Sequence, residues 1–140
     1  TLAGGIGGGP TTAGRDAVHS HMTNTLNTPI ESLEMHYPLR VHRYAVRRDS
    51  GGKGKHDGGA GVVREYEFLE QAQLSLLSER REIAPWGLNE GGEGMRGRNS
   101  LNGKTLPGKC SITVETGDRL LIETPGGGAW GKPATLKNSD

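Results

Sequence analysis

Apolar and polar residues alternate with a period of two in five short segments of the chain, a pattern typical of β-strands with one buried face. These segments begin at Leu39, Val62, Ala72, Ile112 and Leu120. In the first of them the apolar positions change parity between Val41 and Tyr44, which indicates a bulge or a change of buried face. In the second, Arg64 falls on the same face as its apolar neighbours Val62 and Tyr66. We therefore expect a mainly β fold, an antiparallel sheet of about five short strands.

One short helix is expected before the first strand. Thr28-Pro29-Ile30-Glu31 combines an N-cap residue, a proline at the first helical position and a glutamate three residues after the cap. Ile30, Leu33 and Tyr37 then fall on one helical face. Pro38 disfavours helix at the residue before it, so the helix would be about two turns long.

Glycine-rich connections separate these elements, since 24 of the 140 residues are glycine and only 31% are hydrophobic. Ordering that much glycine is costly, because glycine loses the most conformational freedom on folding. The glycine loops would contact a ligand, or they would be ordered by parts of a larger assembly. Residues 1–28 form a glycine-rich and polar loop segment, residues 29–140 form the mainly β domain, and residues 82–109 are expected to be a loop region.

Charge and composition exclude several functions. The net charge is +1 with acids and bases mixed, so we expect no nucleic-acid partner. No apolar run is as long as a membrane span, and no signal peptide is visible, so no membrane partner is expected. Cys110 is the single cysteine and forms no intrachain disulfide, which is compatible with the cytoplasm. Thr1 stands inside a glycine-rich stretch, which suggests a start within a longer protein.

Several side chains suit a site, each with a structural alternative. From an extended chain, the imidazoles of His19 and His21 point the same way, which suits one metal ion; hydrogen bonding to substrate is the alternative. Glu34 lies one turn after Glu31, whose carboxylate the capping box already uses. The adjacent arginines 80 and 81 could hold a carboxylate or phosphate through planar forks, or form a solvated strand end.

A phosphate-binding loop can be tested directly. Gly103-Lys104-Thr105 matches the end of the Walker pattern, but Arg98 occupies the position that requires the first glycine. No strand leads into this stretch and no apolar helical pattern follows it. We therefore reject a phosphate-binding loop here.

An ordered series of motifs resembles the hydantoinase B/5-oxoprolinase family. The matching stretches are residues 19–31, Glu34, 37–40, 49–54, 57–64, 78–81, 85–87, 97–99 and 123–128. They include HMTNTLNTPIE, YPLR, DGGAGVVR, SERR and ETPGGG, and they cover nearly the whole chain in order. By this resemblance the chain would be the carboxy-terminal portion of a B-type protein.

The resemblance implies an ATP-dependent reaction shared with a partner. An A-like ATP-binding subunit or domain would bind ATP and phosphorylate a carbonyl oxygen of a small cyclic amide, such as hydantoin or 5-oxoproline. The B-type protein would then hydrolyse the activated ring, together with the rest of its own chain. Related enzymes carboxylate ketones instead, and a non-catalytic assembly or docking domain is the alternative. A divalent metal is left open.

Within this family the motif residues are assigned candidate roles. Catalysis is assigned to His21 and Glu34, with Glu34 as a proton-transfer group. The candidate substrate contacts are His19, Asn24, Asn27, Arg80 and Arg81. His19 and His21 are the candidate metal ligands. Because the chain cannot supply groups from the rest of a B-type protein, we expect it alone to be an incomplete, inactive fragment.

Overall fold

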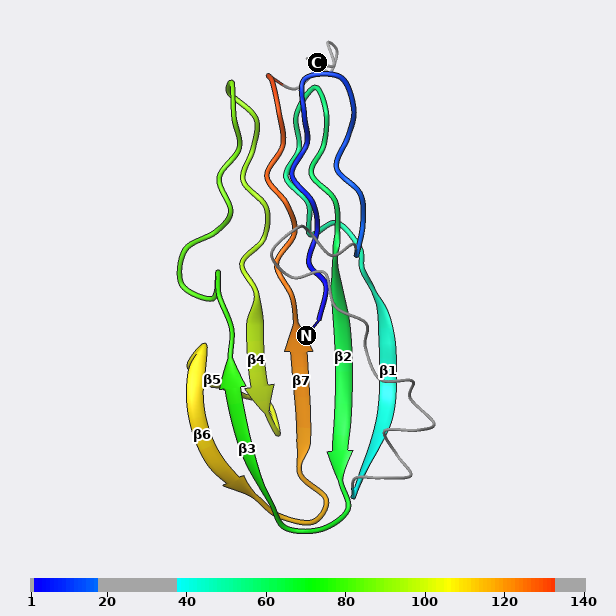
Figure 1. The fold of residues 1–140 in the computed structure, drawn as a ribbon, viewed down its shortest axis with the longest axis vertical. Helices are drawn as coiled ribbons and strands as arrows, with labels where there is room; N and C mark the ends of the chain where they lie inside the picture. Colours follow the sequence, from blue (N-terminus) through cyan, green and yellow to red (C-terminus); the bar gives the residue numbers. More distant parts are fainter. Residues whose placement is uncertain (1, 18–37, 133–140) are drawn as a thin grey trace.

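The computed structural model describes residues 2–17 and 38–132 of the chain. It contains seven strands: β1 Leu39–Arg47, β2 Gly61–Phe68, β3 Ala72–Leu77, β4 Arg98–Leu101, β5 Lys104–Leu106, β6 Lys109–Val114 and β7 Arg119–Glu123. Five of them form an antiparallel sheet in the order β1-β2-β7-β4-β5, and β3 pairs with β6 in a separate ribbon (Figure 1). The predicted mainly β, antiparallel fold is confirmed.

The alternating segments of the sequence are all strands in the structure. They correspond to β1, β2, β3, β6 and β7. The predicted bulge is present too, because the pairing of β1 with β2 changes register between Val41 and Arg43. The predicted helix lies outside the described residues. Within the described part of the chain, no helix is long and apolar enough to cross a membrane.

The prediction that residues 82–109 form only loop is wrong, because β4 and β5 make a hairpin there. Asn102 and Gly103 connect the two strands with φ values of 51° and 87°. Two positive φ angles are what a tight type I′ turn requires, and Asn-Gly is the sequence that favours it. The strands are short and polar, so they lack the apolar alternation that marked the others.

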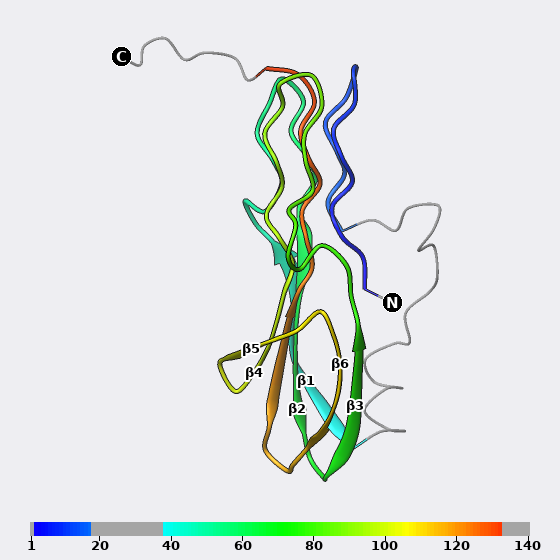
Figure 2. The same ribbon diagram turned by 90° about the vertical axis from the view of Figure 1, so that its left-hand side faces the viewer.

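The hydrophobic core joins the two sheets. Phe68 and Leu120 of the larger sheet pack with Leu76 and Val114 of the β3–β6 ribbon, and all four side chains are buried. In the side view, the ribbon lies along one side of the lower part of the larger sheet (Figure 2). Each such side chain contributes roughly 1.5–3 kcal/mol when it leaves water. This face of the larger sheet is called the inner face below.

Glycine-rich segments form the other half of the molecule. Residues 3–16, 50–60, 85–97 and 124–131 run side by side as extended chain beyond the strand ends (Figures 1 and 2). Along the last segment, Gly127 N donates to Gly59 O at 2.9 Å, Gly128 O accepts from Gly8 N at 2.8 Å, and Ala129 N donates to Gly92 O at 2.9 Å. Successive residues thus bond to three different neighbours, which is the arrangement of a bundle of threefold extended helices rather than a flat sheet. We call it the glycine bundle.

Close approach explains the glycines of this bundle. A Cβ on Gly127 would lie 2.2 Å from the carbonyl oxygen of Ile6, and a Cβ on Gly5 would lie 1.8 Å from that of Gly59. Only a residue without a side chain fits such contacts. The glycines with positive φ in the described residues are 103, 117 and 131, and of these only Gly131, at the end of the last segment, belongs to the bundle. The bundle therefore uses its other glycines for space and not for left-handed backbone.

Candidate functional site

The sequence-predicted site residues divide into two groups. The five candidates His19, His21, Asn24, Asn27 and Glu34 lie outside the described residues. Arg80 and Arg81 are described and lie just beyond the end of β3. Among residues 2–17 and 38–132, no group of three or more His, Cys, Asp or Glu side chains is placed to hold a metal ion. The site that the structure defines is therefore built around arginine.

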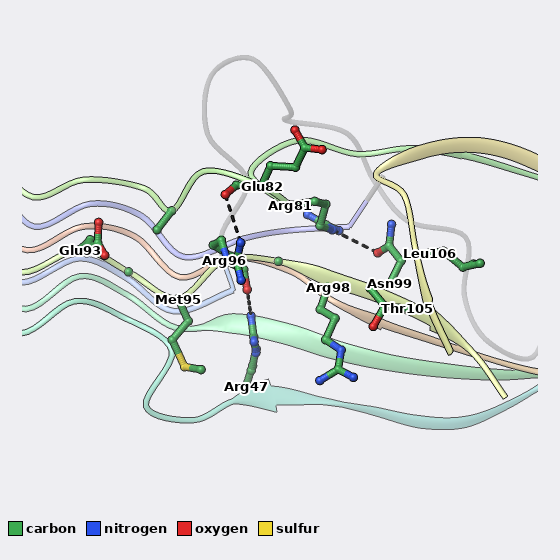
Figure 3. A pocket seen from close by; sticks show the side chains of 13 residues that line it. Arg47, Arg81, Glu82, Glu93, Met95, Arg96, Arg98, Asn99, Thr105 and Leu106 are labelled. Atoms are coloured by element: carbon green, nitrogen blue, oxygen red, sulfur yellow. Dashed lines mark hydrogen bonds between the residues drawn. The ribbon is translucent and has the colours of Figure 1, made fainter. Parts of the chain in front are cut away.

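An open cavity of about 790 Å³ lies where the glycine bundle meets β1 and β4 (Figure 3). Four arginines and two glutamates line it, so positive charge predominates. We call it the arginine pocket. Its polar lining consists of Arg47, Arg81, Glu82, Glu93, Arg96, Arg98, Asn99 and Thr105.

Arg47 enters the pocket from the last position of β1. Its Nη1 donates to the carbonyl oxygens of Arg96 and Thr124, at 2.8 and 2.9 Å, and its Nε lies 3.6 Å from a carboxylate oxygen of Glu123 (Figure 3). Arg96 in turn donates to the carbonyl oxygen of Glu82 at 3.2 Å. Arg47 is thus fixed in place by backbone carbonyls from two segments of the glycine bundle.

Arg81 reaches the same pocket and Arg80 turns away from it. Arg81 donates from Nε to Oδ1 of Asn99 at 3.2 Å and from Nη1 to the carbonyl oxygen of Glu79 at 2.6 Å. Arg80 instead places its guanidinium over the ring of Trp86, 4.6 Å from the centroid. The φ of Arg80 is 57°, a conformation that costs free energy for a residue with a side chain. Because of this backbone conformation, the side chain of Arg80 points toward Trp86 and the side chain of Arg81 points into the arginine pocket.

Asn99 on β4 sets the position of Arg81. It is almost fully buried, and its Nδ2 donates to Oγ of Ser78 at 2.9 Å. Ser78 in turn donates to the carbonyl oxygen of Gly108 at 2.6 Å. Gly97 leaves room for the guanidinium, since a Cβ there would lie 2.2 Å from Nη1 of Arg81. Sequence reasoning missed Asn99 as a functional residue, although it lies within the Gly97-Arg98-Asn99 motif.

Two like charges face one another across the pocket. Burial lowers the pKa of Arg81, and the positive charge of Arg47 lowers it further. Arginine still stays protonated at neutral pH, so the two guanidinium groups repel each other. A bound anion would offset both the burial and the repulsion. The planar donor forks of arginine match carboxylate and phosphate, so the arginine pocket is a candidate anion site.

The pocket is suited to binding and charge stabilisation rather than to nucleophilic attack. Its described lining residues include no histidine, cysteine or serine. Cys110 lies in β6, opposite Leu76, and packs against the hydrophobic core. The groups of its described lining that can move a proton are the carboxylates of Glu82 and Glu93.

Comparison with known proteins places the chain among larger relatives. Residues 1–133 match the family described as hydantoinase B/oxoprolinase. The chain is 48% identical to 5-oxoprolinase 1 of Arabidopsis thaliana over 136 residues, which is 94% of the chain and 11% of the plant protein. It is 36% identical to a protein of Pseudomonas sp. strain NS671 named as the B-type component of a D-/L-hydantoinase, over 94% of the chain and 24% of that protein.

Two solved structures share the fold. The ATP-dependent caprolactamase from Pseudomonas jessenii superposes with a TM-score of 0.75 at 24% identity, over 94% of this chain and 24% of that one. Nucleotide-free acetone carboxylase superposes with a TM-score of 0.70 at 17% identity, over 94% of this chain and 22% of that one. At these identities the likeness shows the fold alone. The chain spans about a tenth of the length of the 5-oxoprolinases that it matches.

Proposed function

The chain belongs to the hydantoinase B/oxoprolinase family, and on that premise we propose that it forms part of a hydrolase that opens cyclic amides. The ring would be activated by ATP on an A-type partner. Its substrate would be of the 5-oxoproline or hydantoin type, as the names of its relatives suggest. The observation that carries this proposal beyond family membership is the arginine pocket.

The chemistry of amide opening explains why such a pocket is useful. An unactivated amide is a poor electrophile. Transfer of a phosphoryl group from ATP to the exocyclic carbonyl oxygen would activate the carbonyl carbon: water adds there, the ring C–N bond breaks as the nitrogen is protonated, and a second water releases phosphate from the acyl phosphate that remains. The activated ring then bears a phosphoryl group with a charge of about −1.5 to −2 at neutral pH. Arg81 and Arg47 face the pocket as planar cations, and they would hold this anion while water attacks the ring carbon.

The proton transfers are assigned to the motif outside the described residues. We propose His21 and Glu34 as the groups that move protons, and His19, Asn24 and Asn27 as substrate contacts. His19 and His21 would also serve as ligands if the enzyme uses a divalent metal. With the proton transfers assigned to these residues, the arginine pocket would bind the phosphoryl group and stabilise its negative charge.

The test uses the full-length protein with its A-type partner and follows ATP-dependent hydrolysis of 5-oxoproline and of hydantoins. Arg81→Gln should lower kcat/KM about tenfold to a hundredfold, the loss expected for charge-assisted hydrogen bonds. The matched control is Arg43→Gln, which removes an exposed arginine of β1 outside the pocket. Equal kcat/KM for both variants would show that the arginine pocket does not contribute to the reaction. Ring hydrolysis absent from the wild-type complex would contradict the reaction itself, and ketone carboxylation with bicarbonate would then be measured.

A docking role is the second candidate, and exposed apolar side chains favour it. Leu77, Ile83, Trp86 and Leu88 are exposed by 88, 67, 62 and 57% within one short segment. Leu77→Asp and Ile83→Asp should weaken binding of the A-type partner if this segment docks it. His21→Ala separates the two roles: it should abolish turnover with assembly intact if the motif is catalytic, and loosen assembly if the domain only docks.

A further inference from the structure

A buried arginine with an unsatisfied nitrogen lies in the larger sheet. Arg64 of β2 is only 4% exposed, and its Nε has no hydrogen-bond partner among residues 2–17 and 38–132. No carboxylate among the described residues forms an ion pair with it, although five ion pairs involve other side chains of these residues. Buried charges in proteins are normally paired or hydrogen-bonded, because removing an ion from water is costly. The environment of Arg64 is therefore incomplete as described.

Two tyrosine rings lie against the guanidinium group. Its central carbon is 4.6 Å from the ring centroid of Tyr44 and 5.2 Å from that of Tyr66. Tyr44 stands opposite Arg64 in the β1–β2 register, and Tyr66 follows two residues later on the same inner face. Such rings attract a cation through their π faces. The N–H donors lie in the guanidinium plane, so a hydrogen-bonding ligand must approach its edge.

Neither tyrosine acts as the missing counter-ion. Burial raises the pKa of Tyr66, and the neighbouring positive charge of Arg64 only partly opposes this rise. The phenol of Tyr66 is therefore neutral at physiological pH. Tyr44 is 44% exposed and contacts the guanidinium through its ring face. Within the part of the chain that the structure describes, no anion balances the positive charge of Arg64.

The side chains beside Arg64 are partly exposed on the β1 side. Tyr44 and Val46, its neighbour on the inner face of β1, are both 44% exposed, so one wall of the site faces solvent and is largely apolar. Ile122 of β7 stands on the other side of Arg64, and Asn99 of β4 stands beyond Ile122 in the same cross-sheet row. Adjacent strands are about 4.8 Å apart, so Arg64 and the arginine pocket lie on neighbouring parts of one sheet.

We propose that Arg64, held between Tyr44 and Tyr66, is the cation of a second anion site that takes a carboxylate. One guanidinium group balances a singly charged carboxylate and offers it a planar fork, whereas a phosphate dianion would keep an uncompensated charge. The carboxylate comes either from a small acid that enters past Tyr44 or from an acidic side chain elsewhere in the longer protein. The proposal does not depend on ring hydrolysis.

The test measures binding and thermal unfolding of the full-length protein without ATP, at constant ionic strength. The probes are acetate, 5-oxoproline and 2-pyrrolidinone, the last being the same lactam ring without a carboxylate. Arg64→Met keeps the packing volume and removes the charge, Arg64→Lys keeps the charge and removes the fork, and Arg43→Gln is the exposed control on β1.

The two sources of carboxylate give different results. If the ligand is a small acid, Arg64→Met should weaken binding of 5-oxoproline and acetate by at least about tenfold, with Arg64→Lys intermediate and 2-pyrrolidinone unaffected. If an acidic side chain of the protein is the partner, Arg64→Met should lower Tm, or prevent folding, because a buried carboxylate loses its partner. In that case Arg64→Lys should restore most of the stability.

One combined result would overturn the proposal. It is a Tm for Arg64→Met equal to or above that of the wild type, with carboxylate affinities unchanged in both Arg64 variants. Arg64 would then be an unpaired cation that only stacks on tyrosine.

Discussion

Arg81 donates a hydrogen bond to the buried side-chain oxygen of Asn99, 3.2 Å away and 18 residues further along the chain. The contact connects the loop after β3 to β4. The side-chain nitrogen of Asn99 in turn donates a hydrogen bond to the hydroxyl of Ser78. Arg81 therefore points into the arginine pocket because a buried amide holds its Nε. Arg80 stacks on Trp86 instead.

Removing this amide should destabilise the domain. Asn99→Ala leaves Nε of Arg81 and Oγ of Ser78 without their partner, and an unsatisfied buried group costs about 1–3 kcal/mol. Urea unfolding measures the loss. Ser111→Ala, which removes an exposed hydroxyl on β6, is the control and should change the free energy of unfolding by less than about 0.5 kcal/mol. Equal effects of the two substitutions would show that the Asn99 contacts contribute little.

Gly97→Ala should impair the arginine pocket by displacing Arg81. The added Cβ would meet Nη1 of Arg81 at 2.2 Å, and the end of a flexible side chain can move aside where backbone cannot. We expect weaker binding of inorganic phosphate or pyrophosphate, measured by titration calorimetry, and a fall in Tm no larger than that of Asn99→Ala, because Oδ1 of Asn99 loses its donor. A large fall in Tm would mean that the backbone, and not Arg81, absorbs the clash.

The glycine bundle should be intolerant of even one methyl group at its contact positions. Gly127→Ala would place a Cβ 2.2 Å from the backbone carbonyl of Ile6, so the segments must separate, at a cost of roughly 3 kcal/mol or more. Gly7→Ala is the matched control, because its nearest atom would be a carbonyl oxygen at an ordinary 3.5 Å. Thermal unfolding should rank wild type and Gly7→Ala together, well above Gly127→Ala. The reverse order would refute the close-packed bundle.

Asp118 connects its own turn, through Glu115, to the β4–β5 turn, through Asn102. Its pKa should depend on both hydrogen bonds. Its carboxylate accepts from the backbone N–H of Glu115 at 2.8 Å and from the side chain of Asn102 at 2.9 Å, and these bonds lower its pKa below the ordinary 3.8. A lowered pKa in the folded state adds stability above pH 3.8 that is lost as the pH falls through the folded value.

Asn102→Gly keeps the positive φ of that turn and removes the amide. The pKa of Asp118, followed by NMR, should rise toward its ordinary value. The difference in the free energy of unfolding between the wild type and Asn102→Gly should become smaller in acid. An unchanged pKa would show that the bond from Glu115 alone sets it.

Much of the candidate site could not be predicted from sequence. The arginines 80 and 81 looked equivalent as neighbours, but the positive φ of Arg80 and the Asn99 acceptor of Arg81 separate them in the structure. Arg47 is 49 residues from Arg96, and it joins Arg96 and Arg98 in one pocket because the end of β1 and the start of β4 lie at the same side of the glycine bundle. Period-two alternation did place Arg64 on the apolar face of its strand, but it could not show that no carboxylate of the described residues stands beside it.

The sequence by itself determined strands β1, β2, β3, β6 and β7. Each of them has its own alternation of apolar and polar residues, which can be recognised without knowledge of the rest of the fold. It determined the bulge in β1 for the same reason, and the motifs of residues 19–128 were sufficient to indicate the family. Only the tertiary structure decided how the glycine segments pack. Glycine has no side chain with which to specify a neighbour, so its contacts are defined by backbone carbonyls from four distant segments, and these become neighbours only when the chain has folded.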